Sequence, residues 1–307
     1  MAFQAAYRKL LESGELKTRI QTLTDDLKSC EICPRDCRVN RTEGELGSCR
    51  VGRRALVSSA GPHYGEEDPL RGWRGSGTIF FAGCNLHCRY CQNASISQRA
   101  AGDPVEPREL GEIMLDLQDR GCHNINLVSP THVAAQILEA LFHAARGGLK
   151  IPLVYNSGGY DKQSTLKLLD GVVDIYMPDM KYADERIARK FSAVEDYPRI
   201  NREAVLEMHR QVGDLQLSPE GLAQRGLLVR HLLLPEGSAG TEQILEFLAE
   251  KVSQNTYLNL MDQYRPAYRA DLFPVLRKRI TRREYEEAVE QAKNLGLRRL
   301  DGMIRSG

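Results

Sequence analysis

Residues 78–93 read Thr-Ile-Phe-Phe-Ala-Gly-Cys-Asn-Leu-His-Cys-Arg-Tyr-Cys-Gln-Asn, a short apolar run followed by cysteines with the spacing C-x3-C-x2-C. The β-branched and aromatic run at 78–82 predicts a strand. Three thiolates so close together can bind one metal centre. Tetrahedral zinc needs a fourth ligand, which His87 could supply, whereas an iron-sulfur cluster with three protein ligands leaves one iron open. Thiolates suit both metals, so the spacing alone leaves both interpretations open.

Strand and helix patterns alternate along the chain after this motif. The six expected strands cover residues 78–82, 124–128, 152–156, 173–177, 228–234 and 257–261. The expected helices cover 107–120, 131–145, 162–169, 203–212 and 241–252, and a capping box of Thr281 and Glu284 begins a last helix. This alternation predicts an α/β fold, either a doubly wound sheet or a partial six-stranded (βα)6 parallel barrel. Both place their chemistry at the carboxyl ends of the strands.

The composition limits the classes of partner. The chain has 307 residues with 42 Lys and Arg against 41 Asp and Glu, a net charge of +1. No global field therefore holds it on nucleic acid or on an anionic membrane. The first twenty residues lack the apolar core of a signal peptide, and no apolar run is long enough to span a bilayer. We expect a soluble, cytoplasmic protein without a membrane partner.

A second group of cysteines lies before the first strand. Of the eight cysteines, only Cys122 stands outside the two groups. The segment 30–77 is rich in Gly, Arg and Pro with little periodicity, so we expect a loop-rich extension that a bound metal helps to fold. Zinc and a second 4Fe-4S cluster are both possible, and C-x2-C with a later cysteine pair favours zinc. The expected ligands are Cys30, Cys33, Cys37 and Cys49.

These patterns divide the chain into four parts. Residues 1–29 are expected to form a helical lead-in, and 30–77 the cysteine-rich metal-binding segment. Residues 78–265 would form the (βα)6 core, and 266–307 a helical extension at the carboxyl end.

The motif Cys84-x3-Cys88-x2-Cys91, with Tyr90 before its last cysteine and a place after the first strand of a βα repeat, resembles the radical S-adenosylmethionine (SAM) superfamily. The resemblance implies that the three cysteines hold three irons of a 4Fe-4S cluster and that SAM chelates the fourth. It also implies reductive cleavage of SAM to methionine and a 5′-deoxyadenosyl radical that abstracts a hydrogen atom.

Further stretches narrow this resemblance. The sequences at 33–37, 47–49, 128–132, 176–181 and 259–266 are similar to pyruvate formate-lyase activating enzyme-like proteins, and the similarity covers nearly the whole chain. It implies an oxidoreductase of the activase type that installs a glycyl radical on a partner protein. Reduced flavodoxin or ferredoxin is then the implied electron donor.

The resemblance also implies cofactor-binding positions at the strand ends, and it implies no particular catalytic residue. At the second strand the superfamily commonly has a Gly-Gly-Glu stretch, which is Ser-Pro-Thr-His here. Thr131 has an alternative role as a helix cap, and His231 as a satisfied core histidine. A charged pair after a strand is otherwise a solvated loop. The implied SAM-binding positions are Tyr90, Ser129, Thr131, Asn156, Ser157, Asp179, Lys181 and His231, with a substrate-facing rim at Asn259, Asp262, Gln263 and Tyr264.

Two alternative functions stay open. One is a radical SAM enzyme that modifies a peptide or a small molecule. The other is a non-catalytic cysteine-metal module that binds nucleic acid, although only Trp73 supplies a stacking aromatic and the net charge argues against such a partner. The arginines of that module would be Arg50, Arg53, Arg54, Arg71 and Arg74.

Overall fold

A computed structural model describes residues 3–302 of the chain and shows an α/β fold built on a mostly parallel sheet. Its six parallel strands coincide with the six predicted ones, although β8 begins earlier than expected and β6 later. The predicted α/β class is therefore confirmed. In order of pairing the strands are β2 (Ser76–Phe81), β4 (Ile125–Val128), β5 (Leu153–Ser157), β6 (Ile175–Pro178), β8 (Ala223–Leu232) and β9 (Tyr257–Met261).

The curved sheet is a partial barrel. Within residues 3–302, β2 and β9 do not pair with each other, so the two ends of the parallel series leave a seam. Part of this seam is bridged by the connection before α3 (Asp68–Arg71), where the Asn259 side chain on β9 donates a 2.8 Å hydrogen bond to Glu67 Oε1. The interior is therefore closed on this side by a segment that precedes the first parallel strand.

The sheet also has antiparallel strands that the sequence patterns miss. β1 (Ala55–His63) pairs with β2 and with β3 (Asp103–Val105), and β7 (Gln216–Leu217) pairs with β8. The prediction of a loop-rich segment at 30–77 is therefore wrong for β1. Its sequence includes Ser, Gly and Pro and lacks clean alternation, because β1 is held by pairing on both edges rather than by an apolar face. β1 joins the cysteine-rich segment to the main sheet.

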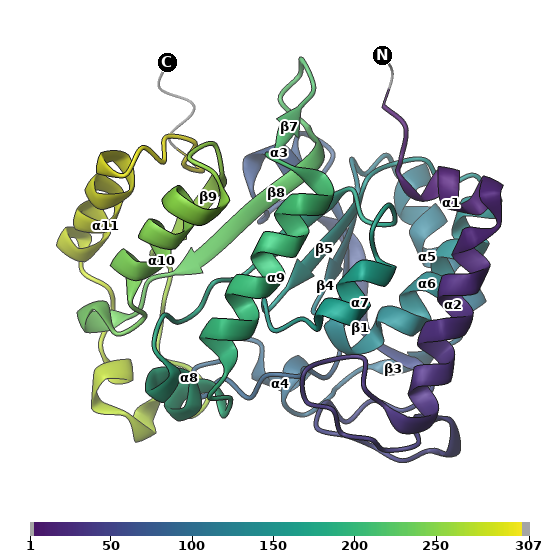
Figure 1. Ribbon diagram of the computed structural model, residues 1–307, viewed down its shortest axis with the longest axis horizontal. Coiled ribbons are helices and arrows are strands. Elements are labelled where there is room, and N and C mark those ends of the chain that lie inside the picture. The colour runs from purple at the N-terminus through teal and green to yellow at the C-terminus, as the bar shows by residue number, and fades with distance from the viewer. Residues whose placement is uncertain (1–2, 303–307) are drawn as a thin grey trace.

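The helices cover the outside of the barrel, and no helix within residues 3–302 is long and apolar enough to cross a membrane. In Figure 1, α1 and α2 lie beside α6 on one side of the molecule, and α10 and α11 lie together on the other. The predicted helices are confirmed, including the Thr281 and Glu284 capping box, although α9 begins earlier than the expected residue 203. The short helices α3 and α4 and the helix α8 are missed. The helices are α1 (Tyr7–Ser13), α2 (Glu15–Asp26), α4 (Ala94–Ser97), α5 (Pro107–Asp119), α6 (Ala134–Arg146), α7 (Gln163–Leu168), α8 (Glu185–Ser192), α9 (Tyr197–Val212), α10 (Thr241–Phe247), which continues as a π-helix (Leu248–Val252), and α11 (Arg282–Asn294).

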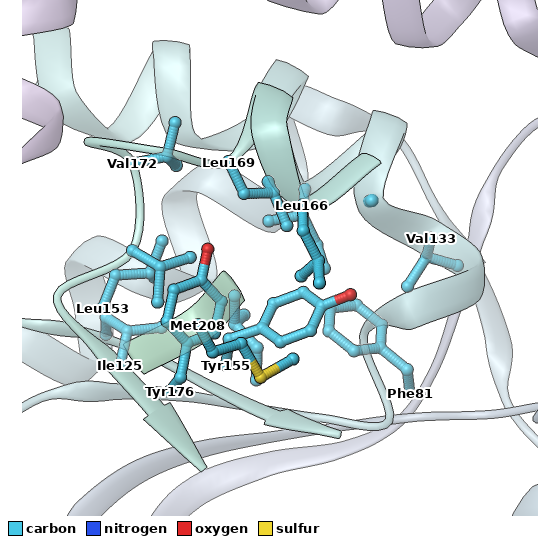
Figure 2. Close-up of a cluster of buried hydrophobic side chains, with 14 of the residues drawn as sticks. Phe81, Ile125, Val133, Leu153, Tyr155, Leu166, Leu169, Val172, Tyr176 and Met208 are labelled. Atoms are coloured by element: carbon cyan, nitrogen blue, oxygen red, sulfur yellow. The ribbon is translucent and has the colours of Figure 1, made fainter. Parts of the chain in front are cut away.

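Alternation along the strands separates two apolar layers. Outward-facing residues such as Tyr155 and Tyr176 pack against Leu166 and Met208 of the covering helices, as Figure 2 shows. Val154, Ile175, Met177, Leu228 and Tyr257 form a separate buried cluster with Leu70, Leu215 and Ala223. These strand residues alternate with the outward set, so they line the barrel interior. The interior therefore has an apolar floor, and polar side chains must lie nearer the carboxyl ends.

Candidate active site

The cysteine motif begins where β2 ends. Gly83 has φ of +82°, and a Cβ there would lie 2.5 Å from the Cys49 carbonyl oxygen, so only glycine fits. This close approach places the segment that ends at Cys49 directly against the start of the motif. β2 ends at Phe81 and α4 begins at Ala94, so the motif occupies the connection that leaves the carboxyl end of β2, and Figure 1 shows α4 in the lower half of the molecule. The motif therefore lies at the carboxyl ends of the strands, as predicted.

Each motif sulfur has a polar neighbour in the protein. Hydrogen bonds of this kind stabilise a thiolate and orient it toward a metal. The neighbours are Leu86 N at 3.4 Å from Cys84 Sγ, Ser192 Oγ at 3.0 Å from Cys88 Sγ and Ser97 Oγ at 3.1 Å from Cys91 Sγ.

Without a metal, the Cys84 and Cys88 thiols favour their protonated form, because burial raises the pKa of both. Desolvation raises the pKa of Cys84 to about 12, and the neighbouring Cys88 thiol adds to the shift. A bound metal centre replaces those protons. Three soft thiol ligands on one loop, each with a polar neighbour, fit the three protein ligands of an iron-sulfur cluster.

His87, the expected fourth ligand of a zinc ion at the motif, already has other hydrogen-bond partners. His87 uses both ring nitrogens within the protein, with Nε2 2.7 Å from Ser48 Oγ and Nδ1 3.1 Å from Gln98 Oε1. Within residues 3–302, no group of three or more His, Cys, Asp or Glu side chains is arranged to hold a single ion. A tetrahedral ion with Zn–S bonds of about 2.3 Å would draw its thiolates together, whereas a cluster binds each thiolate through a different iron.

A charge network that is largely shielded from solvent lies at the ends of the neighbouring strands. Asp179, which follows β6, accepts a hydrogen bond of 2.6 Å from Lys181 Nζ and one of 3.0 Å from Arg230 Nε. Arg230 Nη2 also donates to Asn156 Oδ1 at 2.8 Å. Burial opposes ionisation of Asp179, but Lys181 and Arg230 together hold its pKa below the usual value. The pair after β6 is thus no solvated loop, since only 14% of the Asp179 side chain is exposed.

Three predicted positions, Asn156, Asp179 and Lys181, are therefore brought together. Sequence reasoning missed Arg230 as the fourth member. The signal was present, because Arg230 precedes His231 on a strand and adjacent strand residues face opposite sides of the sheet.

Lys181 connects this network to the cysteine loop. Burial lowers the pKa of its ammonium group, but Asp179 and then Cys88 outweigh that effect and raise it, so Lys181 lies close to the motif sulfur. A Cβ added at Gly158 would lie 3.8 Å from Lys181 Cε and 2.9 Å from Leu86 Cδ1 of the motif. The cations and the thiols consequently belong to one site.

Two hydroxyls that were predicted to bind SAM, those of Thr131 and Ser157, instead contact a buried carboxylate. Thr131 Oγ1 and Ser157 Oγ donate to the Asp161 carboxylate at 2.6 and 2.7 Å, and the Tyr155 hydroxyl donates at 3.0 Å. Burial raises the pKa of Asp161, while the three donors lower it. Thr131 is therefore neither a helix cap nor a free hydroxyl, and sequence reasoning missed Asp161.

Both ring nitrogens of His231 also have hydrogen-bond partners within the protein. Its Nδ1 lies 2.6 Å from the Met180 carbonyl oxygen and its Nε2 lies 3.0 Å from Thr241 Oγ1. Burial lowers the pKa of His231 to about 4, so the imidazole is neutral at pH 7. These contacts favour the alternative of a satisfied core histidine.

Ser129 and Tyr90 stay at the site as structural positions. Ser129 has φ of 60° and donates its backbone N–H to the Asn156 carbonyl oxygen at 2.9 Å. Tyr90 is buried and accepts a 2.7 Å hydrogen bond from the Tyr182 hydroxyl. Its ring also packs edge-on against Tyr264 at 5.8 Å, which makes Tyr264 a buried neighbour of the motif rather than an open rim.

The amino-terminal cysteines gather in one place. Desolvation raises the pKa of Cys33 to about 12, and Cys49, Cys30 and Cys37 add to the shift by their proximity. All four thiols are free of disulfides. The zinc interpretation gains no support from their arrangement, because they too form no single-ion group within residues 3–302. Metal binding at these cysteines stays a prediction.

The barrel interior contains unpartnered polar atoms between its apolar floor and the charge network. Glu67 Oε2 and both atoms of the Asn126 amide are buried without a hydrogen-bond partner among residues 3–302. Asn126 lies close enough to Glu66 to favour its ionised form, although burial raises the pKa of Glu66 overall. The central place of Asn126 in an apolar predicted strand was the signal that sequence reasoning missed.

The arginines of the nucleic-acid alternative do not form a free basic surface. Arg53 makes two hydrogen bonds to the Glu139 carboxylate, at 2.8 and 2.6 Å. Arg54 pairs with Glu106, and Arg71 pairs with Asp68. Three of the five arginines are thus neutralised by neighbouring carboxylates.

Comparisons with known proteins show the family of the chain. Residues 78–248 match the Radical SAM superfamily, and the chain belongs to that superfamily. An uncharacterized protein of Methanocaldococcus jannaschii is 32% identical over 292 residues, which cover 92% of this chain and 79% of that protein. The family implies a 4Fe-4S cluster and SAM as cofactors.

Two crystal structures of Streptococcus suis SuiB are also similar in part. The one bound to S-adenosylmethionine has a TM-score of 0.49 at 12% identity and covers 71% of this chain and 47% of SuiB. The one bound to the precursor peptide SuiA has a TM-score of 0.46 at 13% identity and covers 69% and 44%. The matched region thus spans less than half of the SuiB chain.

Proposed function

We propose that this protein cleaves SAM reductively to a 5′-deoxyadenosyl radical, which abstracts a hydrogen atom from a substrate. The observation that carries the proposal is the network of Asp179, Lys181 and Arg230 beside Cys88. When bound, the cluster supplies the electron for cleavage of the sulfonium. Cys84, Cys88 and Cys91 would hold three of its irons.

The protein's own residues bind and orient the cosubstrate in this proposal. Lys181 and Arg230 are two largely buried cations that share the Asp179 carboxylate. Glu66 and Glu67 also lie near Arg230, but burial raises the pKa of both carboxyls, so they favour the neutral form more than Asp179 does. A guanidinium and an ammonium group at one site suit the carboxylate of SAM. Asp179 acts as a positioning residue, because it fixes both cations from opposite oxygens.

The barrel interior below the network is the proposed substrate site. A buried polar atom without a partner costs about 1–3 kcal/mol, so Glu67 and Asn126 favour a ligand with its own hydrogen-bonding groups. The apolar floor beneath them would exclude water from the radical.

Two classes of substrate are compatible with this proposed reaction. The resemblance to activating enzymes favours a glycyl-radical protein as the substrate, and a radical modification of a peptide or a small molecule is the alternative. An electron paramagnetic resonance spectrum of a glycyl-radical protein incubated with this protein and SAM separates them. A glycyl radical doublet supports the activase form, and its absence alongside SAM cleavage supports the alternative.

The test of the SAM site is equilibrium binding to the anaerobically reconstituted protein. We expect Lys181→Met to weaken binding about tenfold to a hundredfold, since it removes a charged contact worth about 1.5–3 kcal/mol. Cluster absorbance should not change. Lys150→Met, which removes an exposed ammonium group, is the matched control. Equal affinity in the parent protein and Lys181→Met would refute the proposed site.

A further inference from the structure

A polar cavity of about 210 Å³ lies between the two cysteine groups. Its lining comes from the end of the amino-terminal cysteine segment, from the radical motif and α4, and from the loop after β9. The residues that matter here are Ser48, Arg50, Arg89, Ser97, Gln98 and Arg269.

Three arginines give this cavity its charge. Within residues 3–302, no carboxylate lies within 4.0 Å of the guanidinium groups of Arg50, Arg89 and Arg269. By contrast, Arg53 and Arg54, which follow Arg50 in the sequence, each form an ion pair with a glutamate. The net charge of the whole chain is only +1, so this cavity is a local concentration of positive charge. Unpaired guanidinium groups around a cavity attract anions.

The backbone holds the three arginines in place. Arg50 has φ of 62°, in the left-handed region, and its Nη1 donates to the Gln98 carbonyl oxygen at 3.2 Å. The backbone N–H of Arg269 donates to the Arg89 carbonyl oxygen at 2.8 Å, which joins the loop after β9 to the motif. The arginines are therefore placed by interlocked loops rather than by a single mobile segment.

The cavity is one hydrogen bond away from a motif sulfur. Ser97 lines it, and its Oγ lies 3.1 Å from Cys91 Sγ. Cys49 lines the same cavity from the opposite segment. A partner seated here thus approaches the metal centre of the motif and the amino-terminal cysteines together.

We propose that this cavity docks the acidic surface of a small one-electron carrier protein, whose carboxylates pair with Arg50, Arg89 and Arg269. The inference rests on the proposed function, which consumes one electron for each SAM cleaved. In the transfer, the carrier is oxidised by one electron and the iron-sulfur centre at Cys84, Cys88 and Cys91 is reduced by one, with no bond or proton exchanged. A compact cavity fits the carboxylates of a protein better than the extended track of a polynucleotide.

Reduced flavodoxin, an acidic protein, is the probe. The measurements are its binding to the reconstituted protein by fluorescence anisotropy and the rate of cluster bleaching by stopped-flow absorbance. We expect Arg269→Glu to lower both the affinity and the second-order rate constant about tenfold or more, and Arg89→Glu with Arg269→Glu to lower them further. Added sodium chloride should also lower the second-order rate constant of the parent protein with flavodoxin, because salt screens the attraction between the two proteins. Arg298→Glu, the same change at an exposed site near the amino end of β9, is the control.

Reduction by dithionite distinguishes a loss of carrier docking from a loss of SAM cleavage, because this small reductant needs no docking surface on the protein. We expect Arg269→Glu to match the parent protein in dithionite-driven bleaching and SAM cleavage. Failure of the parent protein with dithionite would refute the proposed function, whereas the binding measurement would still decide the docking surface. The inference is wrong if flavodoxin reacts equally with the parent protein and Arg269→Glu. It is also wrong if citrate occupies the cavity without competing with flavodoxin, which would make the cavity a site for small anions only.

Discussion

Ser192 Oγ donates a 3.0 Å hydrogen bond to Cys88 Sγ, although the two residues are 104 positions apart in the sequence. Ser192 is fully buried, and its hydroxyl also lies 2.7 Å from the Tyr182 hydroxyl, which in turn donates to Tyr90. α8, which ends at Ser192, therefore places a fixed donor at one ligand of the proposed cluster. Hydrogen bonds to cysteine sulfurs are among the factors that set cluster potentials.

Removal of this donor should lower the reduction potential of the cluster. We expect Ser192→Ala to shift the midpoint potential by about 20–60 mV to more negative values, since the lost hydrogen bond is worth about 0.5–1.5 kcal/mol and stabilises the more negative state. Redox titration followed by electron paramagnetic resonance measures the shift. Ser95→Ala, an exposed serine on α4, should leave the potential unchanged. A potential in Ser192→Ala equal to that of the parent protein would contradict this role.

Neutralising Asp179 should destabilise the fold as well as the site. In Asp179→Asn, Lys181 and Arg230 keep their charges in a largely buried place but lose the one carboxylate that is hydrogen-bonded to both, which costs about 3–5 kcal/mol. Urea unfolding measures the loss. The exposed Asp103→Asn change should cost little by comparison. If the two variants unfold at the same urea concentration, Asp179 is not the residue that holds the network together.

Asp174 predicts a pH dependence of stability. Its oxygens accept hydrogen bonds from the backbone N–H groups of Ala6 and Leu153 at 2.8 and 3.0 Å, and burial raises its pKa to about 7. Because the folded state keeps a proton that the unfolded chain releases, this residue's contribution to stability falls as pH rises from about 4 to about 7. The slope is at most about 1.4 kcal/mol per pH unit. Urea unfolding across this range should give a free energy of unfolding whose slope against pH is more positive for Asp174→Asn than for the parent protein, and identical slopes would rule out a titrating Asp174.

The amino-terminal cysteines should bind metal independently of the radical motif. A variant with Cys84, Cys88 and Cys91 changed to Ala should keep metal at the other group, since the two groups belong to different loops that β1 and α3 separate in the sequence. Elemental analysis identifies it: about one zinc indicates a structural site, and about four irons with sulfide indicate a second cluster. A folded variant that binds neither metal, with all four remaining thiols reactive to a labelling reagent, would disprove an independent site.

The parallel strands could be predicted from sequence because each is a short, mainly apolar run followed by polar or glycine residues, as in Thr78–Ala82. β1 could not, since Ser, Gly and Pro interrupt its pattern and its pairing with β2 is a tertiary contact. Dependence on tertiary contacts also explains which site residues could be predicted. The motif cysteines are close in sequence and were found, whereas the Asp161 and Arg230 contacts join different strands and depend on which face each side chain occupies.

The most direct test of the account is release of 5′-deoxyadenosine by the anaerobically reconstituted protein given dithionite and SAM. We expect release by the parent protein and by Cys122→Ala, whose buried thiol lies outside both cysteine groups. We expect none from Cys84→Ala, Cys88→Ala or Cys91→Ala, because each lacks one of the three ligands that leave a single iron open. Undiminished release from any of these three variants would contradict the assignment of the site.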